Sequence, residues 1–149
     1  MPKITTADIT ALGFTAAMFA LDDTDWTTMA TDMIAEQAAL LEGRIGSTSY
    51  AATSNPAAAY TKRAEKCLVA AELLQRRFVI LSQEVQTANG LDAFKIRRTR
   101  QEYIDEANAL IERIVNGQAS DSSGYSGGVA TSSHFADTTT LGGLEVAGA

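Results

Sequence analysis

The stretch YTKRAEKCLVAAELLQRRFVILSQEV, residues 60–85, decides the fold of this chain. Small and apolar residues recur in it at alternating intervals of four and three, a spacing that places them on one face of a long α-helix. Because alanine recurs on this face, a second helix can approach it closely. The stretch therefore predicts a helix of about 30 residues, about 45 Å long, packed against another helix. We call this face the core seam; it comprises Tyr60, Ala64, Cys67, Leu68, Ala71, Leu74, Phe78 and Leu81.

The flanking residues indicate where this long helix begins and ends. Asn55 precedes Pro56, and asparagine caps helices well while proline fits the first helical position. At the other end, the pair Asn89-Gly90 is a turn signal that breaks the helix. The long helix is therefore expected between these two signals.

Two further helices are predicted before it. A short helix is expected in TTADITALGF, residues 5–14, with Thr5 as its cap, Asp8 in its first turn and a stop at Gly13. A longer helix is expected at 25–45, after the turn LDDTD and before a stop at Gly46. The residues GSTSYAATSN that follow are predicted to form a loop.

The last helix is predicted to start late. In LDAFKIRR, residues 91–98, apolar and basic side chains alternate at 94–97, and a period of two is typical of extended chain. The sequence TRQE at 99–102 then matches a capping box, which predicts a helix at about 100–115 that ends at Asn116-Gly117. Its apolar side comprises Tyr103, Ala107, Leu110 and Ile114.

These elements predict an all-α fold, a small bundle of one short and three longer helices over 1–116 with an extended C-terminal arm at 117–149. The arm is rich in Gly, Ser and Thr and buries too little apolar surface to order alone. It is either a solvated tail or a segment that lies along the sheet edge or groove of a partner. The residues expected to make that contact are Val129, Phe135, Thr138, Thr139, Leu141, Leu144 and Val146.

Charge is unevenly distributed along the chain, whose formal net charge is −6. The acidic total argues against a dedicated nucleic-acid binder. Residues 1–61 carry seven acids and two bases, residues 62–116 carry ten bases and eight acids, and the arm carries three acids and no base. Copies of the chain could therefore pair head to tail; the alternative is that these are solvated faces.

A basic run, KIRRTR, stands out in the middle segment. We expect it just before and at the start of the last helix, where the helix dipole disfavours cations. An external acidic surface would offset this, supplied by a neighbouring subunit, a partner protein or a DNA backbone. A solvated loop is the alternative, and DNA is the weakest of the three partners because no aromatic residues are interleaved. The predicted contact residues are Lys95, Arg97, Arg98 and Arg100.

Residues for catalysis or metal binding are sparse. The only histidine is His134, and no cluster of Cys and His provides zinc ligands. Cys67 lies on the core seam, where a cysteine acts as a small hydrophobe. We expect no enzyme activity, no metal and no cofactor. Neither a secretory signal nor an apolar run of about 20 residues is evident, so no membrane association is expected.

The layout of helices and the pattern in YTKRAEKCLVAAELL, residues 60–74, resemble the head–tail adaptor (connector) proteins of tailed bacteriophages. The pattern is carried by Tyr60, Ala64, Leu68, Ala71 and Leu74. The resemblance covers about residues 4–116 by layout and the arm by character. The chain departs from the family pattern in the size of its 47–55 loop and in an arm that is poor in charge.

The resemblance implies a structural virion protein in the neck, between capsid and tail, made in the host bacterial cytoplasm. Such adaptors form a homo-oligomeric, dodecameric ring below the portal protein, and DNA passes through its channel without sequence recognition. The arm would embrace the portal, and the lower face would receive a downstream neck or tail component. Two alternatives remain: an oligomeric helical DNA-binding or packaging subunit, and another head-completion protein.

Overall fold

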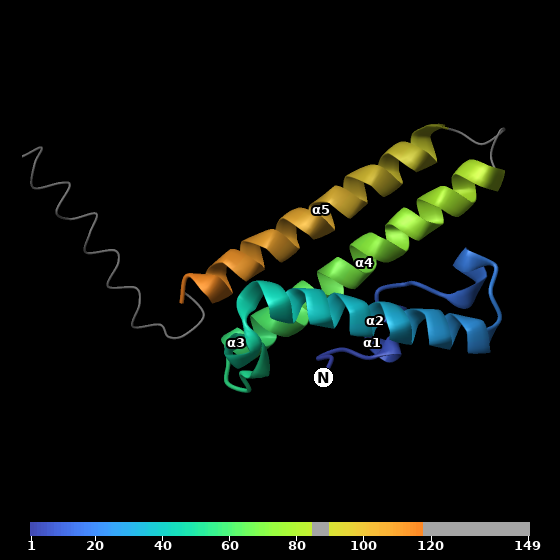
Figure 1. Cartoon of the computed structure of the whole chain (residues 1–149). Coiled ribbons are helices and arrows are strands. Elements are labelled where there is room, and N and C mark those ends of the chain that lie inside the picture. Colours follow the sequence, from blue (N-terminus) through green and yellow to red (C-terminus); the bar gives the residue numbers. More distant parts are fainter. Residues whose placement is uncertain (85–89, 118–149) are drawn as a thin grey trace, which may run out of the picture. The chain divides into compact units, whose positions relative to one another are not determined.

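The protein is all-α in the part that the structure, a computed structural model, describes: residues 1–84 and 90–117. This part contains five α-helices, one 3-10 helix and no strand, so the predicted fold class is confirmed (Figure 1). The predicted arm lies outside the described residues except for Gly117. In chain order the elements are α1 (Thr6–Thr10), η1 (Ala16–Phe19), α2 (Asp23–Ile45), α3 (Ser47–Ala51), α4 (Ala57–Glu84) and α5 (Gly90–Val115).

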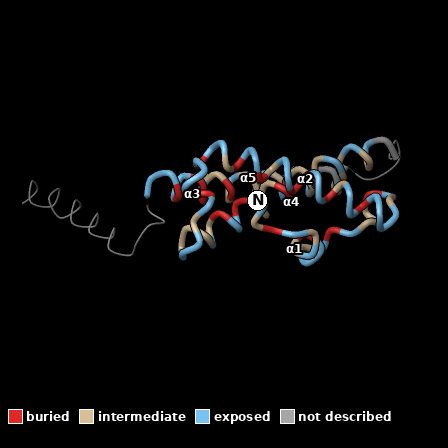
Figure 2. The backbone as a smooth tube through the Cα atoms, turned by 60° about the horizontal axis from the view of Figure 1, so that its bottom comes forward, coloured by how far each residue is buried: buried red, intermediate tan, exposed pale blue. Residues whose placement is uncertain are grey.

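Helix α4 is the centre of the bundle because it contacts every other helical element. Its core seam runs along α5, and the two form a long antiparallel hairpin (Figure 1). The opposite side of α4, which carries Val69 and Leu73, packs against α1, η1 and α2. A helix with two apolar sides is buried between its neighbours, which explains why the buried positions in Figure 2 recur along α4.

The core consists of two clusters, one towards each end of α2. Near the start of α2, Trp26 stacks on Phe19 with ring centroids 5.3 Å apart, and the cluster continues into Val69 and Leu73 of α4. Near the end of α2, Leu41 packs with α3 and with the last turns of α5; this cluster includes Ala38, Ile45, Tyr50, Ala64, Leu110, Ile111 and Ile114. Helices α2 and α5 therefore run in the same direction, and both begin at the same end of the bundle.

The N-terminal half contains the two predicted helices, α1 and α2, together with two short elements that were not predicted, η1 and α3. Helix α1 has Thr5 at its cap and Asp8 in its first turn, as predicted. Helix α2 begins at Asp23, two residues earlier than expected. The reason is that the Asp22 carboxylate caps it, accepting hydrogen bonds from the backbone N–H groups of Thr24 at 2.9 Å and Asp25 at 2.8 Å. The predicted loop after Gly46 contains α3, which forms because Tyr50 is drawn into the core and is only 3% exposed.

The prediction for the start of the last helix was wrong. Residues 91–98 are helical, not extended, and the expected capping box at 99–102 lies inside α5. The side of α5 that faces α4 continues two turns further back than the predicted start at Tyr103, through half-buried Arg100 and Ile96. Packing against α4 therefore outweighs the short alternating pattern, since tertiary contacts override weak local preferences.

Candidate functional site

The burial of the core seam decreases from the N-terminal half of α4 to its C-terminal half. At the N-terminal half, Ala64, Cys67 and Ala71 are buried between the helices. The remaining seam residues are only half-buried; they are Tyr60, Leu68, Leu74, Phe78 and Leu81. Among the side chains whose burial the structure describes, the last buried one on α4 is Leu73 and the first on α5 is Ala107. The α4–α5 hairpin is therefore well buried at its base, where α4 begins and α5 ends, and only half-buried towards its other end.

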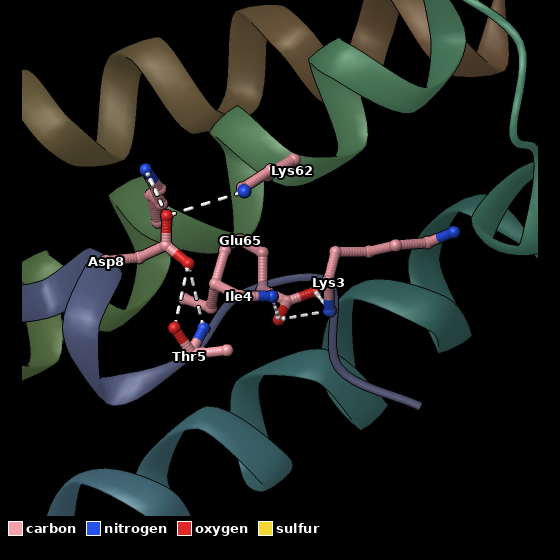
Figure 3. Close-up of polar contacts among 7 residues, drawn as sticks. Lys3, Ile4, Thr5, Asp8, Lys62 and Glu65 are labelled. Carbon is pink, nitrogen blue, oxygen red and sulfur yellow. Dashed lines mark hydrogen bonds and ion pairs between the residues drawn. The ribbon is translucent and has the colours of Figure 1, made fainter.

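A buried carboxylate anchors the N-terminal segment to α4 (Figure 3). Glu65 is 0% exposed, and the backbone N–H of Lys3 donates to its two oxygens at 3.0 and 3.2 Å. The N–H of Ile4 donates at 3.3 Å, and the hydroxyl of Tyr50 donates at 2.6 Å. This cluster was not predicted from the sequence. The only signal was a second stripe on α4 at intervals of four, formed by Thr61, Glu65, Val69 and Leu73.

Burial has the largest effect on the pKa values of Glu65 and Tyr50 in this cluster. Desolvation raises the pKa of Glu65, and its three donors offset this only in part. Desolvation and the neighbouring carboxylate of Glu65 together raise the pKa of Tyr50. The carboxylate and its donors are all used in contacts that join the N-terminal segment, α3 and α4. The cluster is therefore a structural clamp that fixes the N-terminus across α4.

A second set of polar contacts lies beside the clamp. Asp8 forms ion pairs with Lys66 at 2.7 Å and with Lys62 at 3.4 Å, and it accepts hydrogen bonds from the N–H and hydroxyl of Thr5 (Figure 3). Hydrogen bonding to Lys66 is the main cause that lowers the pKa of Asp8. These contacts join α1 to α4, and they leave Asp8 ionised across the neutral range.

Cys67 lies between α4 and α5 beside an ion pair. Arg63 donates to the two carboxylate oxygens of Glu106 at 2.7 and 3.2 Å, and this contact lowers the pKa of Glu106. Burial raises the pKa of the Cys67 thiol to about 11. A protonated, buried thiol is a poor nucleophile, so the arrangement agrees with a packing role for Cys67.

The basic run occupies the interior of α5, not its start as predicted. Arg97 lies over the ring of Phe78 at 4.8 Å, and Arg98 pairs with Glu102 one turn away at 3.0 Å. Arg100 takes a position on the side of α5 that faces α4, and its Nε is buried without a hydrogen-bond partner among the described residues. The helix dipole thus cannot explain this run. The exposed members are Lys95, Arg97 and Arg98.

We use the term hairpin end for residues 74–82 of α4 and 95–106 of α5. None of these described side chains is buried, although many are apolar. Val79 is 43% exposed and opens onto a shallow hollow of about 460 Å³ between η1, α2 and α4. The half-buried apolar residues of the hairpin end are Leu74, Phe78, Ile80, Leu81, Ile96, Tyr103 and Ile104.

The described residues hold no group of His, Cys, Asp and Glu that could bind a metal ion. Within the same ranges, no helix combines the length and the hydrophobicity needed to cross a membrane. The predicted contact residues of the arm, Val129 to Val146, lie outside the described part of the chain. No protein-family model, curated protein or solved structure matches the chain.

Proposed function

We propose that this chain is a structural virion protein, a head–tail adaptor of the bacteriophage neck that forms a ring below the portal. The observation that carries the proposal is the hairpin end. It presents apolar side chains, several of them half-exposed, on a helix pair that η1 and the start of α2 cover only in part. Such surface is stabilised when a second protein covers it. A ring of identical copies provides this cover to every subunit.

The rest of the described chain suits an assembly role. The polar clusters around Glu65, Asp8 and Arg63 join helices to one another and leave no free acid, base and nucleophile together. The base of the bundle is closely packed around buried Leu41, Ala64 and Ile111, which gives a ring a defined building block. In this proposal the arm at 117–149 docks on the portal, and a downstream neck or tail component binds the opposite face.

A DNA-binding or packaging subunit is the second candidate, favoured by the three exposed bases of the basic run on α5, Lys95, Arg97 and Arg98. Two of these already have contacts: Arg97 with Phe78, and Arg98 with Glu102. The test is retention on DNA at increasing salt, because binding through phosphates weakens steeply as salt rises. An affinity for DNA that falls steeply with salt, together with a monomeric chain, would favour this candidate over the adaptor.

The adaptor proposal is tested with the full chain and purified portal particles. We expect the chain to assemble into rings visible by negative-stain electron microscopy, and to bind the portal in cosedimentation. Removal of 117–149 should abolish portal binding while far-UV circular dichroism retains its helical signal. A chain that neither assembles nor binds portal would refute the proposal.

A further inference from the structure

The surface of α2 that faces away from the core carries an acidic stripe. We define it as Asp25, Asp32 and Glu36, all exposed and none in an ion pair within the described part of the chain. Asp32 and Glu36 are one helical turn apart, so their charges repel each other. The residues between them on this surface are small: Thr28, Ala35 and Ala39. A second helix could therefore approach the stripe closely.

The outer surface of α5 at the hairpin end carries the opposite charge. We call Lys95 and Arg98, which lie on one side of the helix, the basic face; Arg97 is two residues from Lys95 and lies on another side, over Phe78. Lys95 and Arg98 are one turn apart and repel each other. The ion pair of Arg98 with Glu102 is 73% and 61% exposed at its two side chains, so it contributes little and exchanges easily for another partner.

The two surfaces lie at the same end of the bundle but on opposite sides of α4. Helix α2 packs on the side of α4 that carries Val69 and Leu73, and α5 packs on the core seam. Because α2 and α5 begin at the same end, the acidic stripe and the basic face are at a similar height along the hairpin (Figure 1). A contact between them joins copies side by side with little shift along the helices. Head-to-tail contacts of this kind form a ring when the rotation between copies closes, as the proposed function requires, and an open filament when it does not.

We propose that the basic face of α5 in one copy docks on the acidic stripe of α2 in the next copy. This inference rests on the self-association in the proposed function and names the two surfaces that carry it. Charge complementarity selects the partner. The acidic stripe borders Arg76 of α4 but forms no ion pair among the described residues, and Arg98 of the basic face has only its exposed pair with Glu102. Like charges repel within each surface.

The test reverses each surface separately in the full chain. One variant carries Asp32→Lys and Glu36→Lys, and the other carries Lys95→Glu and Arg98→Glu. All four side chains are exposed, so both variants should keep the far-UV circular dichroism of the unaltered chain. The matched control is Glu112→Lys, an exposed charge near the other end of α5. Mass photometry and sedimentation velocity report the assembled fraction.

Each variant alone should weaken assembly at least tenfold, since like charges then meet at every contact, and the control should not change it. An equimolar mixture of the two variants should assemble again, because each contact in an alternating ring then joins opposite charges. The unaltered ring should also weaken in about 1 M NaCl.

Three results would overturn the inference. If the unaltered chain forms rings and the variants do too, the surfaces are wrong while the proposed ring stands. If the variants dissociate and their mixture fails to assemble, the two surfaces do not meet each other. If the unaltered chain stays monomeric under all conditions, the self-association in the proposed function fails, and this inference fails with it.

Discussion

Replacement of Glu65 by alanine should destabilise the helical body more than any surface change. The substitution leaves three donors without their acceptor: the N–H groups of Lys3 and Ile4, and the hydroxyl of Tyr50. Ile4 and Tyr50 are 4% and 3% exposed, so water cannot replace the lost contacts without opening the core. The N–H of Lys3 is only partly buried and recovers water more easily.

The magnitude follows from these contacts. A buried donor left unsatisfied costs about 1–3 kcal/mol. Two such donors give about 2–6 kcal/mol, and relief of the buried carboxylate charge offsets part of this. We therefore expect Glu65→Ala to lower the free energy of unfolding by about 3 kcal/mol. That is a large share of the stability of a domain of this size.

Two further variants separate the contribution of the backbone N–H groups from that of the Tyr50 hydroxyl. Glu65→Gln keeps one acceptor oxygen for the N–H groups, and the Tyr50 hydroxyl can rotate to accept from the new amide; we expect a loss of about 1 kcal/mol. Tyr50→Phe removes one donor and leaves the carboxylate its other two, with an expected loss of about 1–2 kcal/mol. In the double variant Glu65→Ala/Tyr50→Phe the losses should not add, because the two groups share one contact.

Urea unfolding followed by circular dichroism measures these losses. Fluorescence of the single tryptophan, Trp26, provides a second probe in the cluster near the start of α2. Amide hydrogen exchange should show residues 3–5 exchanging faster in Glu65→Ala. A loss below about 1 kcal/mol for Glu65→Ala, with unchanged exchange at the N-terminus, would refute the reasoning.

Three other experiments test the Asp8–Lys66 ion pair, the Arg63–Glu106 ion pair and the Cys67 thiol. Asp8→Asn should lower the free energy of unfolding by about 1 kcal/mol at pH 7. Pairing with Lys66 lowers the pKa of Asp8 in the folded protein, so this stabilisation should be lost as the pH falls below the ordinary value of 3.8. The free energies of unfolding of the two proteins should therefore converge in acid. Arg63→Met breaks the half-exposed pair with Glu106 and should cost less than about 1 kcal/mol in urea unfolding; a loss of several kcal/mol would contradict this. The Cys67 thiol, with a pKa of about 11, should resist a disulfide reagent at pH 8 until urea unfolds the chain, whereas rapid labelling of the folded protein would show that it is accessible.

The long central helix was predictable because its signal is local. The core seam repeats at the period of the α-helix, and backbone geometry alone converts that period into one apolar face. The caps at Thr5 and the stop at Gly46 are equally local, since each depends on residues within one turn. The second buried side of α4 carried a weaker signal, because Thr61 and Glu65 interrupt its apolar pattern.

The start of α5 shows where local signals fail. The alternation at 94–97 favoured extended chain, and the residues 99–102 matched a cap. Helical continuation instead extends the apolar side of α5 along α4, with Ile96 half-buried on it. A contact across the hairpin outweighs a preference of a few tenths of a kcal/mol per residue.

The sequence by itself determined that the chain is a helical bundle around one long helix, and that its charge is segregated along the chain. Only the tertiary structure decided that Glu65 is a buried acceptor for Lys3, Ile4 and Tyr50, and that acidic and basic surfaces lie on opposite sides of α4. The physical reason is the range of the interactions. Periodicity is a property of neighbouring residues, whereas the partner of a polar group depends on segments that packing brings together from far apart in the chain.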